Sequence, residues 1–211
     1  MKKMVVALFL LFVTHGMYAQ QKAVTETGEE VLLYDDGTWE YINENTLPLS
    51  EIPINPTTFS KDDESSFLLK SSKIDMGFWL NPKVWSFKKA SGNEDAEYEF
   101  QLKDGDLYGM IISELIEIPL ETLKTVALNN ARSVAPDVKV IKEEIRMVNG
   151  LKVLHLQMNG TIQGIKFSYY GYYYSNADGT VQFITYTAQN LIESYESKCE
   201  NLLNGMVELK K

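Results

Sequence analysis

The stretch from Leu151 to Gly205 constrains the fold of this chain more than any other. It contains three apolar and aromatic segments separated by turn residues, followed by a segment with helical spacing. Tight turns between such segments predict antiparallel strands, and the closing segment from about Gln189 to Leu203 predicts a helix with one apolar stripe. We therefore expect an antiparallel sheet that packs against a helix.

Three two-residue turns, at Asn149-Gly150, Asn159-Gly160 and Ala177-Asp178, set the register of this sheet. Residues that oppose each other across a turn share a sheet face, and faces alternate along each strand. One face is expected to be a core face and collects Ile141, Ile145, Met147, Leu154, Leu156, Met158, Ile165, Phe167, Tyr169, Ile184 and Tyr186. The other face is polar and aromatic and collects Lys142, Glu144, Arg146, Val153, His155, Lys166, Ser168, Tyr170, Tyr172, Tyr174, Phe183, Thr185 and Thr187.

The polar and aromatic face is the first candidate binding site. Tyr170, Tyr172 and Tyr174 stand in a row on it, and Phe183 lies opposite Tyr172. Tyrosine offers a large contact area and a polar tip, which suits recognition of a partner. Alternatively, a helix covers this face and the tyrosines are part of the core. The sequence leaves both interpretations open.

His155 and Glu144 form the second candidate site. The register places them opposite each other, and a carboxylate beside an imidazole raises the pKa of the histidine and can orient its ring. Such a pair could act as a base with its orienting group, or it could be a cross-strand ion pair. No nucleophile is placed with it by any motif, so we predict no catalytic residue.

The region before this sheet is expected to contain several smaller elements. Met76–Leu80 and the hairpin of 97–102 with 107–116 are predicted strands, and Pro119 begins a helix that Pro136 ends. Further towards the N-terminus, Val31–Tyr34 and Thr38–Ile42 flank a turn and predict a β-hairpin.

The remaining N-terminal residues divide the chain. Residues 20–29 are polar and are expected to be loose, and residues 43–66 are expected to be a proline-bearing linker. Trp39 and Tyr41 should pack on something, because an isolated two-stranded hairpin is marginal in water. The expected organisation is a leader at 1–19, an N-terminal segment at 20–42, the linker at 43–66 and one domain at 67–211.

The first 19 residues are typical of a secretory signal peptide. A positive start is followed by an apolar run that is too short to span a bilayer. The leader contains no cysteine, so no lipid anchor is expected, and the protein should be periplasmic or secreted. Cys199 is the only cysteine, and it is expected to be a buried, inert thiol.

Charge and motif content exclude several classes of function. The formal net charge is −9, which disfavours nucleic acid and anionic membranes as partners. The acidic turns do not match the spacing of a calcium loop, and the sequence contains no phosphate-binding loop, no Gly-x-Ser-x-Gly elbow and no His-Glu-x-x-His motif. We therefore expect neither a cofactor nor a metal.

The second part of the chain, roughly residues 67–209, resembles the PsbP-like fold superfamily, which includes PsbP of photosystem II, the nuclear-import factor Mog and DcrB-type envelope proteins. The resemblance rests on MGFWLNPKVW, the hairpin Glu97–Ile116, the helix at Pro119, and YYSNADGTVQFITYT followed by a helix that ends in LLNG. It implies an α+β fold in which an antiparallel sheet packs with two main helices as an α/β/α sandwich. It also implies binding or assembly roles without catalysis. The N-terminal hairpin is similar to hairpins of secreted proteins from Bacteroidetes-type bacteria.

These observations lead to three functional hypotheses. The first is an exported, non-catalytic binding or assembly module of the bacterial envelope; the sequence does not identify its partner, which is expected to be an envelope protein or a small molecule. The second is a small-molecule carrier with a pocket between sheet and helix, lined by Trp79, Trp85 or the tyrosines. The third is a hydrolase that uses carboxylates or the His155–Glu144 pair.

Overall fold

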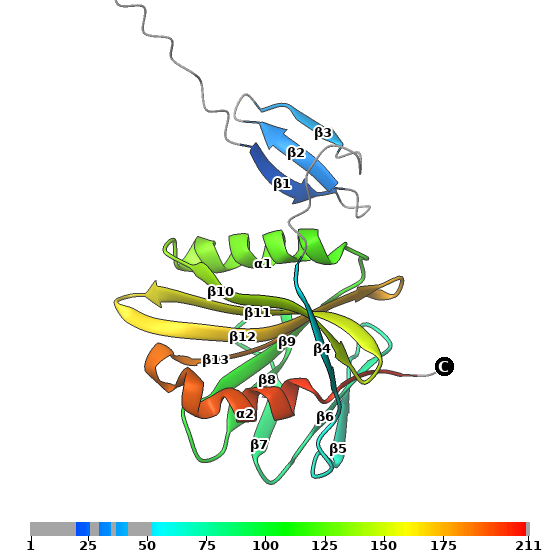
Figure 1. Ribbon diagram of the computed structural model, residues 1–211, viewed down its shortest axis with the longest axis vertical. Helices are drawn as coiled ribbons and strands as arrows, with labels where there is room; N and C mark the ends of the chain where they lie inside the picture. The colour runs from blue at the N-terminus through cyan, green and yellow to red at the C-terminus, as the bar shows by residue number, and fades with distance from the viewer. Residues whose placement is uncertain (1–19, 26–29, 35–36, 42–51, 210–211) are drawn as a thin grey trace, which may run out of the picture.

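The computed structural model describes residues 20–25, 30–34, 37–41 and 52–209. Its largest element is an eight-stranded sheet with the strand order β4-β10-β11-β12-β13-β9-β8-β7 (Figure 1). The strands are β4 (Ile54–Phe59), β7 (Trp85–Lys89), β8 (Ala96–Leu102), β9 (Tyr108–Glu114), β10 (Lys139–Val148), β11 (Leu151–Ile162), β12 (Ile165–Asn176) and β13 (Gly179–Ala188). All neighbours are antiparallel except β4, which runs parallel to β10.

Two helices pack on opposite faces of this sheet (Figure 1). Helix α1 (Leu120–Val134) buries Leu123 and Ala127 against the face that carries Leu154 and Leu156. Helix α2 (Ile192–Leu203), which follows a 3-10 turn at Gln189–Leu191, buries its apolar stripe against the other face. The expected α+β fold with two main helices is confirmed.

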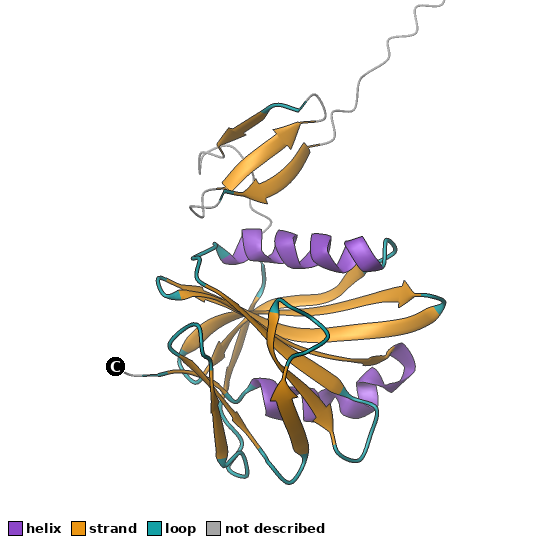
Figure 2. Ribbon diagram, turned by 180° about the vertical axis from the view of Figure 1, so that it is seen from behind, coloured by secondary structure: helices purple, strands orange, loops and turns teal. Residues whose placement is uncertain are grey.

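A second, three-stranded sheet lies beside α2 on the same face of the large sheet (Figure 2). Its order is β14-β6-β5, formed by Met206–Glu208, Met76–Leu80 and Phe67–Lys70. The ring of Phe78 in β6 lies 5.1 Å from that of Phe183 in β13. The small sheet and α2 therefore bury this face of the large sheet together.

Two of the three predicted turns are correct. Arg146 lies opposite Val153 across Asn149-Gly150, and Tyr172 lies opposite Phe183 across the turn that follows Asn176. The turn at Asn159-Gly160 is wrong, because β11 continues to Ile162 and turns at Gln163-Gly164, which both have positive φ. The observed turn lies an even number of residues after the predicted one. Each residue of β11 and β12 therefore stays on the sheet face that was predicted for it.

Three members of the predicted core face are exposed. Ile141 is 54% exposed because a bulge between Val140 and Lys142 turns Val140 towards α1 instead. Met147 lies beside the edge strand β4, and Ile165 is next to the hairpin turn.

The N-terminal residues contain more structure than the sequence predicts. The hairpin is β2 (Glu30–Tyr34) with β3 (Trp39–Tyr41), but residues 20–24 are not loose, since they form β1 (Gln20–Val24) on the other side of β2. The predicted turn residues Asp35 and Asp36 lie outside the described residues, as does the predicted leader at residues 1–19. Within the stretch expected to be a linker, Ile54–Phe59 is instead β4 of the large sheet.

Candidate functional site

The tyrosine row of β12 is covered, so the second of its two interpretations holds. Tyr170, Tyr172 and Phe183 are fully buried, and Tyr174 is 9% exposed. They pack in one cluster with Cys199, Leu202 and Leu203 of α2 and with Phe78 of β6. The structure therefore brings the predicted residues together beneath α2, and they do not form an exposed surface.

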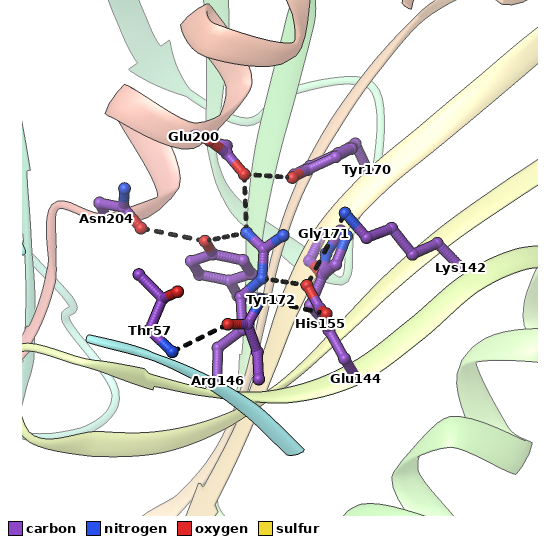
Figure 3. Close-up of polar contacts among 11 residues, drawn as sticks. Thr57, Lys142, Glu144, Arg146, His155, Tyr170, Gly171, Tyr172, Glu200 and Asn204 are labelled. Atoms are coloured by element: carbon purple, nitrogen blue, oxygen red, sulfur yellow. Dashed lines mark hydrogen bonds and ion pairs between the residues drawn. The ribbon is translucent and has the colours of Figure 1, made fainter. Parts of the chain in front are cut away.

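Arg146 of β10 is the centre of the polar contacts on this face (Figure 3). Its side chain is 2% exposed. Its Nε donates to Oε1 of Glu144 at 2.6 Å, and its Nη1 donates to the hydroxyl of Tyr172 and to Oε1 of Glu200, both at 2.9 Å. A buried guanidinium is stable only when its charge and its donors are satisfied, and two carboxylates meet that need here.

The carboxyl end of α2 supplies the other half of this network. The Tyr170 hydroxyl donates to Oε1 of Glu200 at 2.8 Å, and the Tyr172 hydroxyl donates to Oδ1 of Asn204 at 2.9 Å. Together with the contact between Arg146 and Glu200, they join the end of α2 to two strands of the large sheet, β10 and β12. We call this set the Arg146 cluster, which consists of Glu144, Arg146, Tyr170, Tyr172, Glu200 and Asn204.

The edge strand β4 closes the Arg146 cluster on one side. The Phe59 ring lies 4.5 Å from Cζ of Arg146, close enough for a cation–π contact. Asn55 donates from Nδ2 to Oε2 of Glu144 at 3.1 Å, and its Oδ1 accepts the backbone N–H of Thr57 (Figure 3). A segment expected to be a linker thus completes the burial of the arginine.

The charges of the Arg146 cluster stabilise one another. Burial disfavours the guanidinium cation, but its contacts with Tyr172, Tyr170 and Glu144 outweigh burial and raise the pKa of Arg146. Burial also opposes ionisation of Glu144, yet hydrogen bonds from Arg146 and Asn55 hold the pKa of this carboxyl below its usual range. Burial raises the pKa of Tyr172 to about 12, so its hydroxyl is neutral and can donate to Asn204.

His155 does not form the predicted pair with Glu144. The two residues are opposite each other in the register, but the Glu144 carboxylate binds Arg146 and Asn55. The His155 ring is fully buried, and its Nδ1 donates to the carbonyl oxygen of Gly171 at 3.2 Å. Nε2 has no hydrogen-bond partner among the described residues.

The expected pKa shift of His155 is therefore wrong in sign. Burial, and then the positive charge of Arg146, lower the pKa of this imidazole to about 3. The ring is neutral and lies 4.2 Å from the Tyr170 ring, where it acts as a packed core side chain. In this arrangement it is not placed to take a proton from a substrate in solvent.

Sequence reasoning missed Arg146, Glu200, Asn204 and Asn55 as parts of this site. The register placed Arg146 on the tyrosine face, and that was the available signal. Glu200 lies 54 residues after its partner Arg146, and Asn204 lies 32 residues after its partner Tyr172. A hydrophilic helix surface gives no indication of which acid turns inward.

The chemistry of the site is structural. Its donors and acceptors bind one another, and Cys199, the nearby thiol, is buried with its pKa raised to about 11. Within the described parts of the chain, no group of three or more His, Cys, Asp or Glu side chains could hold a metal ion. The contacts hold α2, β4 and the sheet together.

Comparison with solved structures shows the class of fold. The chain is similar to cyanobacterial PsbP (CyanoP) from Synechocystis sp. PCC 6803, with 13% identity and a TM-score of 0.51 over 67% of this chain and 91% of that one. The chain therefore has the PsbP-like fold, as its sequence indicated.

Two further structures are similar at lower TM-scores. LpqN of Mycobacterium tuberculosis, described as involved in cell envelope biogenesis, matches with 8% identity and a TM-score of 0.47 over 68% of this chain and 90% of its own. PA94 of Pseudomonas aeruginosa, a protein of unknown function, matches with 11% identity and a TM-score of 0.44 over 69% and 98%. No family model and no curated protein matches the sequence. Among the described residues, the helices are too short or too polar to cross a membrane.

Proposed function

We propose that this protein is an exported, non-catalytic binding or assembly module of the bacterial envelope, and that it docks an envelope protein through its N-terminal sheet. The leader-like residues 1–19 support export. The Arg146 cluster supports a structural rather than a catalytic role for the buried polar groups, since they bind one another.

The observation that carries the proposal is the exposure of Trp39 and Tyr41. Their side chains lie on the same face of β3, with ring centroids 5.2 Å apart, and they are 53% and 51% exposed. Leu33 lies opposite Trp39 on this face and is 39% exposed. We call these three residues the aromatic face of the N-terminal sheet. Adjacent exposed apolar side chains are typical of protein interaction sites.

The aromatic face lacks the packing that the sequence led us to expect. Among the described residues, nothing covers Trp39 and Tyr41 as α2 covers the tyrosine row. A partner that packs on them would supply the missing contacts, and tryptophan and tyrosine are the residue types that dominate binding energy at interfaces. In this proposal the six residues predicted as a site position the scaffold and do not contact the partner.

We also propose a revised division of the chain. Residues 1–19 are the leader, the sheet of β1, β2 and β3 is a docking unit, and the PsbP-like unit begins at β4 rather than at residue 67. The pairing of β4 with β10 and the contact of Phe59 with Arg146 support this earlier boundary.

Cross-linking of the tagged full chain in intact envelopes tests the proposed function. The wild type should recover one protein in near-stoichiometric amounts, and Trp39→Ala with Tyr41→Ala should lose it. Ile165→Ser is the matched control, because Ile165 is also an exposed apolar side chain, at 67%, but lies beside the turn between β11 and β12 of the large sheet. Loss of the partner in the control, or its retention in the double variant, would contradict the proposal.

A further inference from the structure

A hollow of about 420 Å³ lies on the large sheet, on the same face as α1. Its floor is one row of residues that lie opposite one another across four strands. The row runs from Tyr186 of β13 through Tyr108 of β9 and Gln101 of β8 to Ser86 of β7. The volume is in the range of small-molecule sites. We call it the β7–β13 hollow.

One half of the floor is aromatic. The rings of Tyr108 and Tyr186 are nearly parallel, with an interplanar angle of 22° and centroids 5.7 Å apart. Both are partly exposed, and their hydroxyls form no hydrogen bond with another described residue. The two rings stack on each other, so the pair offers aromatic edges and polar hydroxyl tips, which suits a ligand with an apolar C–H face and a rim of hydroxyls.

The other half of the floor is polar, and its charges compensate each other. Nζ of Lys88 lies 2.9 Å from Oε2 of Glu99, and this pair lies two residues along the strands from Ser86 and Gln101, in the next row on the same sheet face. The Gln101 side chain is exposed and offers both an amide donor and an amide acceptor. The Ser86 hydroxyl donates to the backbone carbonyl oxygen of Gln101 and does not occupy that side-chain amide. Charged groups that are already paired can still hydrogen-bond hydroxyls, but they leave no net charge to attract an ion.

The charge and the length of the hollow narrow the class of ligand. The chain carries a formal net charge of −9, which repels anions at long range. The row crosses four strands, or roughly 14 Å at the usual strand spacing, which is longer than one sugar ring. We propose that the β7–β13 hollow is a binding site for a neutral oligosaccharide, with the stacked Tyr108–Tyr186 pair packing against the sugar rings and with Gln101 and the Lys88–Glu99 pair hydrogen-bonding the sugar hydroxyls.

This site goes beyond the proposed function, because it lies on the large sheet and uses none of the residues of the aromatic face. The two proposals can therefore fail separately. Binding of sugar without a protein partner would contradict only the first, and a protein partner without sugar binding would contradict only the second.

The test is binding of the labelled full chain to an array of neutral and anionic oligosaccharides, followed by backbone chemical-shift mapping with the tightest neutral ligand. We expect shifts confined to β7, β8, β9 and β13. Tyr108→Ala should weaken binding roughly tenfold or more, as expected for a buried aromatic contact. Tyr41→Ala, which removes an exposed tyrosine of the N-terminal sheet, should bind as the wild type does.

Gln101→Ala is the second test variant, because Gln101 is exposed and its loss should leave the fold intact. It should also weaken binding, with an unchanged circular dichroism spectrum. Absence of binding to every neutral oligosaccharide, a preference for anionic ones, or affinity that neither variant changes would overturn the proposal.

Discussion

Replacement of His155 by glutamine should remove most of the pH dependence of stability between pH 7.5 and pH 5. The pKa of His155 is about 3 in the folded protein, well below the usual 6.5 of a histidine side chain, because burial and Arg146 oppose the charged ring. Within this interval the unfolded chain binds a proton that the folded protein does not. The contribution of neutral His155 to the free energy of unfolding is therefore fully present above pH 6.5 and is lost as the pH falls towards 3.

The magnitude follows from the two pKa values. One pKa unit corresponds to about 1.4 kcal/mol, so protonation of the unfolded state alone removes about 2 kcal/mol of stability between pH 7.5 and pH 5. His155 and His15 are the two histidines of the sequence, and His15 lies in the predicted leader. The carboxylates that the structure stabilises, such as Glu144, titrate mainly below this interval.

Urea unfolding followed by circular dichroism at several pH values measures the effect. The wild type should lose about 2 kcal/mol of unfolding free energy over the interval, and His155→Gln should lose much less, whatever its stability at pH 7.5. Equal losses in the two proteins, or a His155 resonance of the folded protein that titrates near pH 6, would refute the reasoning about His155.

Three further predictions follow from the core and the turns. Arg146→Ala leaves two carboxylates without their cation and should lower the unfolding free energy, measured in urea, by roughly 3–5 kcal/mol. The exposed control Arg132→Ala should change it by less than about 1 kcal/mol. Equal effects of the two variants would show that the cluster does not stabilise the fold. Calorimetry should show that Gly179→Ala destabilises the protein more than Gly150→Ala. Both residues have positive φ, but a Cβ at Gly179 would lie 2.2 Å from the Glu114 carbonyl oxygen, whereas one at Gly150 would meet nothing within 4 Å. The reverse order of stabilities would contradict this prediction. Cys199, which is buried with its pKa raised to about 11, should react with a thiol reagent only as fast as the chain unfolds, and rapid labelling of the folded protein would refute that placement.

The sequence predicted the sheet faces better than it predicted the turns. Asn149-Gly150 has φ values of 50° and 86°, as its residue types require, and it fixed the register of β10 and β11. Asn159-Gly160 looks the same in the sequence, but Gly160 lies within β11. A Cβ there would approach the Val138 side chain to 2.6 Å, so this glycine permits close packing rather than a turn.

The elements and contacts that the sequence did not predict depend on distant partners. Strand β4 contains Pro56 and has no regular alternation of burial, so only its parallel pairing with β10 identifies it as a strand. The contact between Arg146 and Glu200 joins residues 54 positions apart. Local patterns carry no information about such pairs, and the tyrosine row could therefore not be assigned to core or surface until α2 was placed over it.

Hydroxyl-radical footprinting of the full chain, purified and within intact envelopes, tests the central claim most directly. That claim is that the tyrosines of β12 are scaffold and that Trp39 and Tyr41 meet the partner. We expect Trp39 and Tyr41 to oxidise readily in the purified protein and to be protected in the envelope, while Tyr170 and Tyr172 stay protected in both. Oxidation of Tyr172 in the folded, purified protein at the rate of Tyr41, or equal oxidation of Trp39 in the two preparations, would contradict the account.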